Sequence, residues 1–219
     1  MPTIHGIPLS PFTRKVCVAM HEKNIAFDLN PIAPVPPAND DPKFRAMSPL
    51  GKIPAFEDGD FSISDSSVIL AYLERAHPDS ALYPQDAKEY ARAMWLEEFA
   101  DSKLVEGVGP VFFERIVAPA FFQRAPDQAA LDVALGEKIP TAFDYLESQL
   151  SGADYLVGKR LSVADIAIGA MLRQFQMASE TVDESRWAKL AKYAETLLER
   201  ESFKKCAVAE AAMMQGAAA

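Results

Sequence analysis

The chain has 219 residues, of which 49% are hydrophobic and 24% are charged, so it can bury a large core in one or two domains. Its formal net charge of −9 repels nucleic acids and anionic membranes, and we expect neither as a partner. It shows no membrane-spanning stretch and no basic, apolar leader. Its two cysteines, Cys17 and Cys206, lie near opposite ends of the chain and do not suggest a disulfide framework, so we expect a cytoplasmic protein.

The first segment of the chain predicts a strand, a helix and a second strand. Residues 3–7 form the first strand, and the helix begins at Pro11, which suits a first helical turn. Ser10 precedes it as an N-cap, and on local sequence alone capping is its simplest role. The helix ends near residue 24, and residues 26–32 form the second strand. Strand, helix and strand within about thirty residues indicate a parallel pair with a right-handed crossover.

The next segment predicts a loop, a short helix and a hairpin. Residues 31–42 are rich in proline and predict a loop, and residues 44–47 predict a short helix. Two short strands between residues 55 and 63 are joined at Asp58-Gly59, where Gly59 accepts a positive φ at little cost. Ile53-Pro54 comes just before them, and the base rate of ~5–6% cis for X–Pro bonds favours a trans bond there.

Asp65 and Ser66 open the helix that follows the hairpin. Their side-chain oxygens suit an N-cap, and the helix runs to residue 77 with apolar residues spaced by threes and fours. The N-terminus of a helix can also bind a carboxylate of a ligand. The local sequence favours the cap.

Everything after a linker at residues 79–86 reads as helical. The run Gly107-Val108-Gly109-Pro110 predicts an interruption of the first of these helices, and Pro140 predicts a kink in the next. Ser162 and Asp165 form a capping box before a helix of small residues that should lie deep in the bundle. The sequence therefore predicts a thioredoxin-like α/β domain over residues 1–78 and an all-α bundle over residues 87–219.

Two landmarks give the chain a family resemblance. The stretch from Pro49 to Pro54, followed eleven residues later by Asp65-Ser66, resembles the glutathione-binding half of the cytosolic glutathione transferases. The stretch from Asp154 to Asp165 resembles the second landmark of that family. The resemblance implies a homodimer that joins glutathione, as co-substrate, to a small electrophilic and mostly apolar molecule. It implies no cofactor and no metal, and the three histidines show no metal-ligand spacing.

The resemblance also assigns roles to residues. Ser10 matches the serine of the serine-type classes, such as phi and theta, which donates a hydrogen bond to the glutathione sulfur. The backbone of Ile53 pairs with the cysteinyl part of glutathione, next to a cis Pro54. Asp65 and Ser66 hold the γ-glutamyl end.

The glycine end of glutathione and the acceptor site follow the family pattern less closely. Asn39 lies in the loop where many members carry a basic residue, and Lys52 is the candidate that supplies the positive charge. The acceptor site should be apolar. Its candidates, each equally well explained as bundle core, are Leu9, Phe12, Phe112, Phe113 and Ile116.

The sequence leaves other activities open. A protein of this fold can also be a glutathione-dependent isomerase, peroxidase or dehalogenase. A non-catalytic binding module is the alternative outside catalysis, and the serine at position 10 argues against it.

Overall fold

A computed structural model describes residues 1–150 and 154–217. The N-terminal part has the predicted strand–helix–strand order, a short helix, a hairpin and a helix. Its elements are β1 (Thr3–His5), α1 (Pro11–Glu22), β2 (Asp28–Asn30), the 3₁₀ turn η1 (Ala38–Asp40), α2 (Pro42–Met47), β3 (Ala55–Asp58), β4 (Phe61–Ser64) and α3 (Ser66–Ala76). The predicted α/β fold class is therefore confirmed.

The four strands form one mixed sheet in the order β2-β1-β3-β4. β1 pairs in parallel with β2 and antiparallel with β3, and β3 pairs antiparallel with β4. His5 lies opposite both Asn30 and Ala55, and Ala55 lies opposite Ser64. The ends of β1, β2 and β4 and the start of β3 therefore share one edge of the sheet, which we call the site edge.

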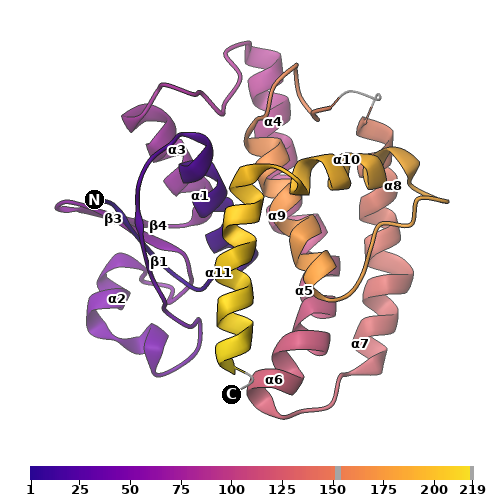
Figure 1. Cartoon of the computed structure of the whole chain (residues 1–219), viewed down its shortest axis with the longest axis horizontal. Coiled ribbons are helices and arrows are strands. Elements are labelled where there is room, and N and C mark those ends of the chain that lie inside the picture. The colour runs from indigo at the N-terminus through magenta and orange to yellow at the C-terminus, as the bar shows by residue number, and fades with distance from the viewer. Residues whose placement is uncertain (151–153, 218–219) are drawn as a thin grey trace.

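The rest of the described chain is helical and lies beside the α/β part (Figure 1). Three π-helical segments, η2, η3 and η4, connect α-helices within longer rods. The elements are α4 (Ala87–Phe99), η2 (Ala100–Leu104), α5 (Val105–Phe112), η3 (Phe113–Val117), α6 (Ala118–Phe122), α7 (Gln128–Val133), η4 (Ala134–Lys138), α8 (Ile139–Gln149), α9 (Val163–Met177), α10 (Ala188–Leu198) and α11 (Glu201–Ala217).

The predicted interruption at residues 107–110 is wrong. These residues lie inside α5, and the helix continues from α4 to α6. Gly107 serves packing instead, because a Cβ there would lie 2.8 Å from Cδ1 of Ile139 on α8. Pro140 lies in the first turn of α8, directly after the π-helical segment η4, so the regular helix changes where the sequence predicted a bend.

Helix α9 is the centre of the bundle, as its small residues predicted. Almost all of its residues are buried, and it packs against α1, α4, α5 and α10. The predicted capping box is present, with the Asp165 carboxylate accepting from the Ser162 amide at 2.8 Å. The same carboxylate accepts from the Leu156 amide at 2.9 Å and the Tyr193 hydroxyl at 2.8 Å. Asp165 therefore fixes the start of α9 to the preceding loop and to α10.

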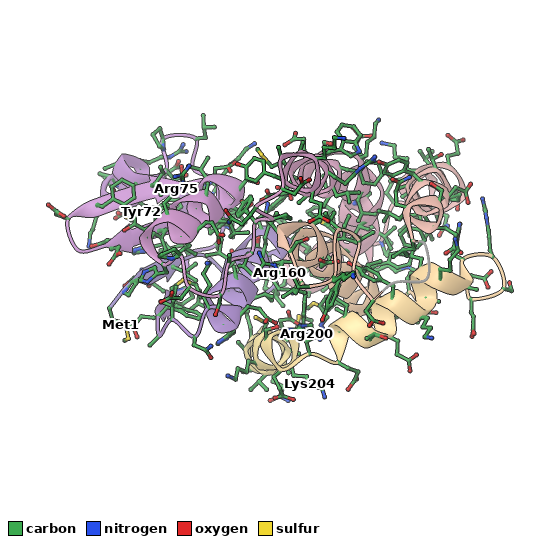
Figure 2. All side chains as sticks on the ribbon, turned by 90° about the horizontal axis from the view of Figure 1, so that it is seen from above. Met1, Tyr72, Arg75, Arg160, Arg200 and Lys204 are labelled. Carbon is green, nitrogen blue, oxygen red and sulfur yellow. The ribbon has the colours of Figure 1, made fainter. Side chains whose placement is uncertain are left out.

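Helix α1 links the two parts of the molecule. It packs against α3 in its own domain and against α9 and α11 of the bundle. Figure 2 places Arg200 where the last helices adjoin the α/β domain. Its guanidinium binds the two carboxylate oxygens of Glu22 at 2.8 and 2.9 Å. The first helix is thus held by charged as well as apolar contacts.

Candidate functional site

The site edge brings together the three parts of the chain that the sequence singled out. Ser10 follows the end of β1, and Ile53-Pro54 immediately precedes β3. Asp65-Ser66 immediately follows β4 and starts α3. Because the register puts these strand ends opposite one another, segments more than fifty residues apart meet around the N-termini of α1 and α3.

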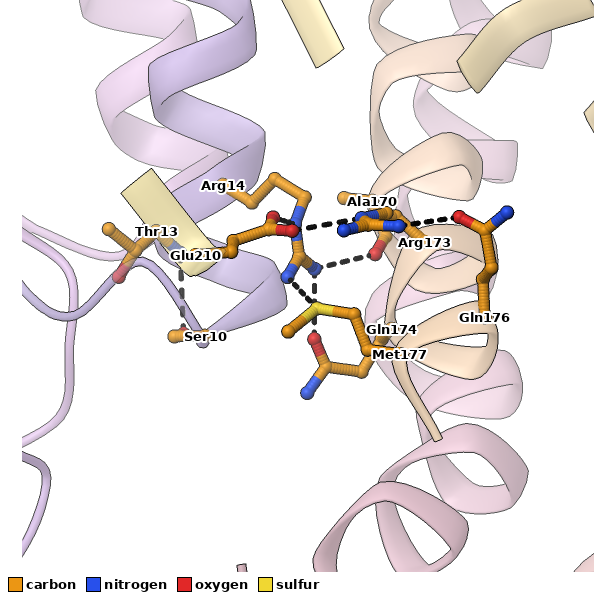
Figure 3. Close-up of polar contacts among 9 residues, drawn as sticks. All are labelled: Ser10, Thr13, Arg14, Ala170, Arg173, Gln174, Gln176, Met177 and Glu210. Carbon is orange, nitrogen blue, oxygen red and sulfur yellow. Dashed lines mark hydrogen bonds and ion pairs between the residues drawn. The ribbon is translucent and has the colours of Figure 1, made fainter. Parts of the chain in front are cut away.

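Ser10 caps α1 and keeps a donor free. Its hydroxyl oxygen accepts from the Thr13 amide at 3.3 Å, a long contact for a bond that is usually about 2.9–3.0 Å (Figure 3). A hydroxyl can accept one bond and still donate another. Capping therefore leaves the O–H of Ser10 available to a ligand. The half-buried side chain sits at the positive end of the α1 dipole.

Thr13 is the other hydroxyl in this turn, and it points inward. Its side chain is fully buried, and its Oγ1 has no hydrogen-bond partner among the described residues. A Cβ on Gly6 would lie 2.5 Å from that Oγ1, so glycine at position 6 makes room for Thr13. Ser10 is therefore the hydroxyl of this turn that a ligand can reach.

Asp65 is the N-cap of α3, and Ser66 is the first residue of that helix. Asp65 has a positive φ of 82°, and its Oδ1 accepts from the amides of Ser67 and Val68 at 3.0 and 3.1 Å. The carboxylate is exposed and its Oδ2 makes no hydrogen bond within the described chain, so it remains free for a cation. Ser66 is 4% exposed, at the first position of the helix.

A buried lysine on α1 donates a hydrogen bond to the first turn of α3. Lys15 on α1 is 1% exposed and donates to Ser67 Oγ at 2.8 Å and to Asp101 Oδ2 at 2.6 Å. Its ammonium also lies 2.8 Å from Glu97 Oε1. The Ser67 hydroxyl in turn donates to Asp101 at 3.0 Å. This network, which sequence reasoning missed, joins α1 and α3 to α4 and η2.

The Ile53-Pro54 bond is cis, as the family resemblance predicted and the base rate did not. The Ile53 side chain is buried in a small cluster with Phe44 and Ala55. What Ile53 can offer at the site edge is therefore its backbone amide and carbonyl.

Two basic residues lie near this segment, and the sequence singled out one of them. Lys52 is exposed and takes part in no ion pair among the described residues. Arg45 on α2 lies over Gly51, where a Cβ would be 2.6 Å from its Cζ. Arg45 also binds Asp40 at 2.6 Å. The amide of Asn39 donates to the Gly51 carbonyl at 3.2 Å, so Asn39 holds the same turn. Arg45 escaped notice because its proximity to Gly51 is a tertiary contact.

The five acceptor candidates differ in exposure, and four of them, Ile116 included, belong to the main hydrophobic core cluster or pack against it. Leu9 and Phe112 belong to the buried core, with Phe12 packed against it. Phe113 is 40% exposed, beside Phe122 at a ring distance of 6.0 Å. Ile116 lines a cavity of about 230 Å³. The other residues around this cavity are Arg173, Met177, Glu210, Ala211 and Met214.

A buried arginine holds one wall of this cavity. Arg14 donates to the Ala170 carbonyl at 3.0 Å and to Gln174 Oε1 at 2.8 Å, and it pairs with Glu210 on α11 (Figure 3). Glu210 also binds Arg173 at 2.9 Å. Because Arg14 follows Ser10 by one helical turn, this network ties the start of α1 to α9 and α11.

Residues 1–150 and 154–217 contain neither a metal-binding cluster nor a helix suited to span a membrane. No three His, Cys, Asp or Glu side chains there gather closely enough to hold a metal ion. In that same part of the chain, no helix is both long enough and apolar enough to cross a membrane.

Comparison with known proteins gives a consistent family. The model of the glutathione S-transferase N-terminal domain matches residues 4–81, and that of the C-terminal domain matches residues 112–206. Glutathione S-transferase 3 of Zea mays is 30% identical over 164 residues, which cover 74% of this chain and 72% of that protein.

Solved structures of glutathione transferases have a similar fold. Glutathione transferase F7 of Populus trichocarpa superimposes with a TM-score of 0.84 at 28% identity, over 95% of this chain and 99% of that chain. A glutathione S-transferase-I bound with lactoylglutathione superimposes with a TM-score of 0.85 over 95% of this chain and 99% of that chain. Its 22% identity shows a shared fold.

Proposed function

The chain belongs to the glutathione S-transferase family, and from this we propose that it conjugates the glutathione thiolate to a small electrophilic, mostly apolar molecule. The observation that carries the proposal is the Ser10 hydroxyl, which keeps its hydrogen free at the N-terminus of α1. Glutathione is the co-substrate, and the proposed reaction uses no cofactor.

Ser10 acts on the pKa of the ligand. A free thiol has a pKa of about 8.5, so little thiolate exists at pH 7. Lowering that pKa by two units takes ~2.7 kcal/mol. A hydrogen bond to a charged acceptor supplies roughly 1.5–3 kcal/mol, and a helix N-terminus adds about 0.3–1 kcal/mol. The two together suffice without a general base. Ser10 therefore stays protonated as a donor while the thiolate attacks the electrophilic carbon.

The rest of glutathione would lie along the site edge. Ser66 and the N-terminus of α3 would bind the γ-glutamyl carboxylate, and the free oxygen of Asp65 would bind its ammonium. The backbone of Ile53, beside Pro54, would pair with the cysteinyl unit.

The glycine carboxylate would lie nearer α2. Lys52 and Arg45 provide the positive charge there, and Asn39 positions the turn at Gly51 between them. The cavity beside Ile116 is the proposed place for the apolar acceptor, since methionines line it and two of its lining residues contact Arg14, one turn after Ser10 on α1.

The role of Ser66 can be tested by removing its hydroxyl. Ser66→Ala should weaken glutathione binding by about 1.5–3 kcal/mol, because it removes a hydrogen bond to a charged group. Isothermal calorimetry measures this directly. The exposed Ser62 on β4 supplies a matched control, since Ser62→Ala should leave the affinity unchanged. Equal affinity in Ser66→Ala, with only a lower melting temperature, would leave Ser66 as part of a helix cap.

We also propose that the linker at residues 79–86 separates two domains. A further proposal is that two copies of the chain associate as a homodimer. Support for the homodimer comes from large exposed apolar side chains, Phe61 on β4, Val68 on α3, which packs against β4, and Met94 on α4. Such side chains are typical of a protein interface. Sedimentation at micromolar concentration should give twice the mass of the chain, and a single-chain mass would contradict the proposal.

The reaction itself is tested with glutathione and a panel of electrophiles. Aryl halides, epoxides, activated alkenes and alkyl halides report conjugation or dehalogenation, and hydroperoxides and maleyl-type alkenes report the related peroxidase and isomerase reactions. Formation of a thioether product supports the proposal. Retention on immobilised glutathione without turnover of any member would indicate a binding module instead.

A further inference from the structure

The two cysteines of the chain, remote in sequence, lie against each other in the fold. Cys17 on α1 is 6% exposed and Cys206 on α11 is 7% exposed. Both cysteines are free and belong to the same buried core cluster, on two helices that pack against each other. The pair therefore connects the first helix of the α/β domain with the last helix of the bundle.

Polar contacts on both sides hold the two helices in this register. About one turn before Cys17, Arg14 pairs with Glu210 on α11. About one turn after it, Glu22 accepts from the Ser202 hydroxyl at 2.6 Å. Residue numbers rise along α1 as they fall along α11, so the helices are antiparallel and Cys17 faces Cys206 between two fixed contacts. The juxtaposition is built into the packing.

The surroundings make the two sulfurs unequal. The neighbouring Cys17 thiol, the His21 ring and the positive charge of Arg14 lower the pKa of the Cys206 thiol to about 6, against the effect of burial. The neighbouring Cys206 and burial raise the pKa of the Cys17 thiol. The pair therefore holds one proton between a thiolate and a thiol near neutral pH. A reactive thiolate beside a second thiol is the arrangement that redox-sensitive cysteines use.

We propose that Cys17 and Cys206 are a site of reversible oxidation, at which a small hydroperoxide converts the two thiols to a disulfide between α1 and α11. The Cys206 thiolate attacks the peroxide oxygen, the O–O bond breaks, and water or an alcohol leaves after taking up a proton. The Cys17 sulfur then attacks the resulting sulfenic acid, the S–O bond breaks, and water leaves. Two thiols are oxidised by two electrons, and one peroxide is reduced. A dithiol reductant reverses the change.

The burial of the two cysteines limits which oxidants can reach them, and their separation in sequence determines how the disulfide affects stability. With side chains this enclosed, hydrogen peroxide can reach the sulfur more readily than a bulky disulfide can. The cross-link closes a loop that contains most of the chain, and loops of that length are the ones whose closure most restricts the unfolded state. The oxidised protein should therefore melt at a higher temperature. The inference stands independently of the proposed conjugation, because its readout is the state of the thiols.

The test is a titration of the whole protein with hydrogen peroxide, followed by alkylation, trypsin digestion and mass spectrometry. We expect both cysteines to lose alkylation together, and peptides 16–23 and 206–219 to appear as one linked species two hydrogens lighter than their sum. Dithiothreitol should restore both alkylation sites and the original melting temperature. Separate oxidation of each cysteine to the sulfinic acid, without a linked peptide, would overturn the proposal.

Two variants make the assignment specific. Cys17→Ser should stop at a sulfenic acid on Cys206, which dimedone traps. His21→Asn should slow oxidation at pH 7, because removing the contribution of His21 raises the pKa of Cys206 and so lowers its thiolate fraction. His77→Asn is the matched control and should keep the original rate. Equal oxidation rates in the unchanged protein, His21→Asn and His77→Asn would contradict the proposal. Dimedone labelling of neither cysteine in Cys17→Ser would contradict it as well.

Discussion

Ser10→Ala should slow glutathione conjugation by about 10²-fold, which corresponds to ~2.7 kcal/mol. The variant loses the donor to the sulfur, so the pKa of bound glutathione should rise toward that of the free thiol. Ultraviolet difference spectra of the bound thiolate across pH measure that pKa directly. An unchanged titration would show that Ser10 does not activate the thiol.

The control for this variant lies one turn further along α1. Thr13 is the other hydroxyl near the turn, and its side chain is fully buried. Thr13→Val keeps the shape of the side chain and should leave both the pKa of bound glutathione and the rate nearly unchanged. The Ser10→Ala variant also loses a cap acceptor, which costs about 0.5–2 kcal/mol of folding stability. Rates should therefore be compared well below the melting temperature of both proteins.

Lys15→Met should lower the free energy of unfolding by about 3–5 kcal/mol, the range for removing one partner of a buried ion pair. The ammonium of Lys15 lies within 2.8 Å of oxygens on Glu97, Asp101 and Ser67. Without it, two carboxylates at the domain border lose their counter-charge. Urea denaturation measures the loss.

An exposed lysine provides the comparison. Lys88 lies on the surface of α4, so Lys88→Met should change the stability by no more than about 0.5 kcal/mol. Adding Asp101→Asn to Lys15→Met should recover part of the loss, because it removes one of the uncompensated charges. A loss below about 1 kcal/mol in Lys15→Met would mean that the network carries little of the stability. Glutathione affinity should fall as well, since Ser67 adjoins Ser66 at the start of α3.

The amino-acid sequence by itself determined the class of the fold and the starts of three helices, α1, α3 and α9. Ser10, Asp65 and the Ser162–Asp165 box were all predicted as caps, and each accepts or exchanges the expected hydrogen bonds. Caps can be predicted from the sequence because a capping hydrogen bond spans only two or three residues. The order of strands and helices was also predicted from the sequence, whereas the register that forms the site edge came from the structure. The cis bond at Pro54 came from the family resemblance, since local preference favours trans.

Only the tertiary structure decided which distant residues meet. The glycine at position 107 looked like a helix breaker, yet it allows α5 to approach Ile139. Lys15 gave no sign of its carboxylate partners on α4 and η2, and Cys17 gave none of its contact with Cys206. Helix propensity and the spacing of apolar residues describe the preference of one isolated segment. The roles of these residues depend on the register between packed helices, which the burial of the whole chain sets.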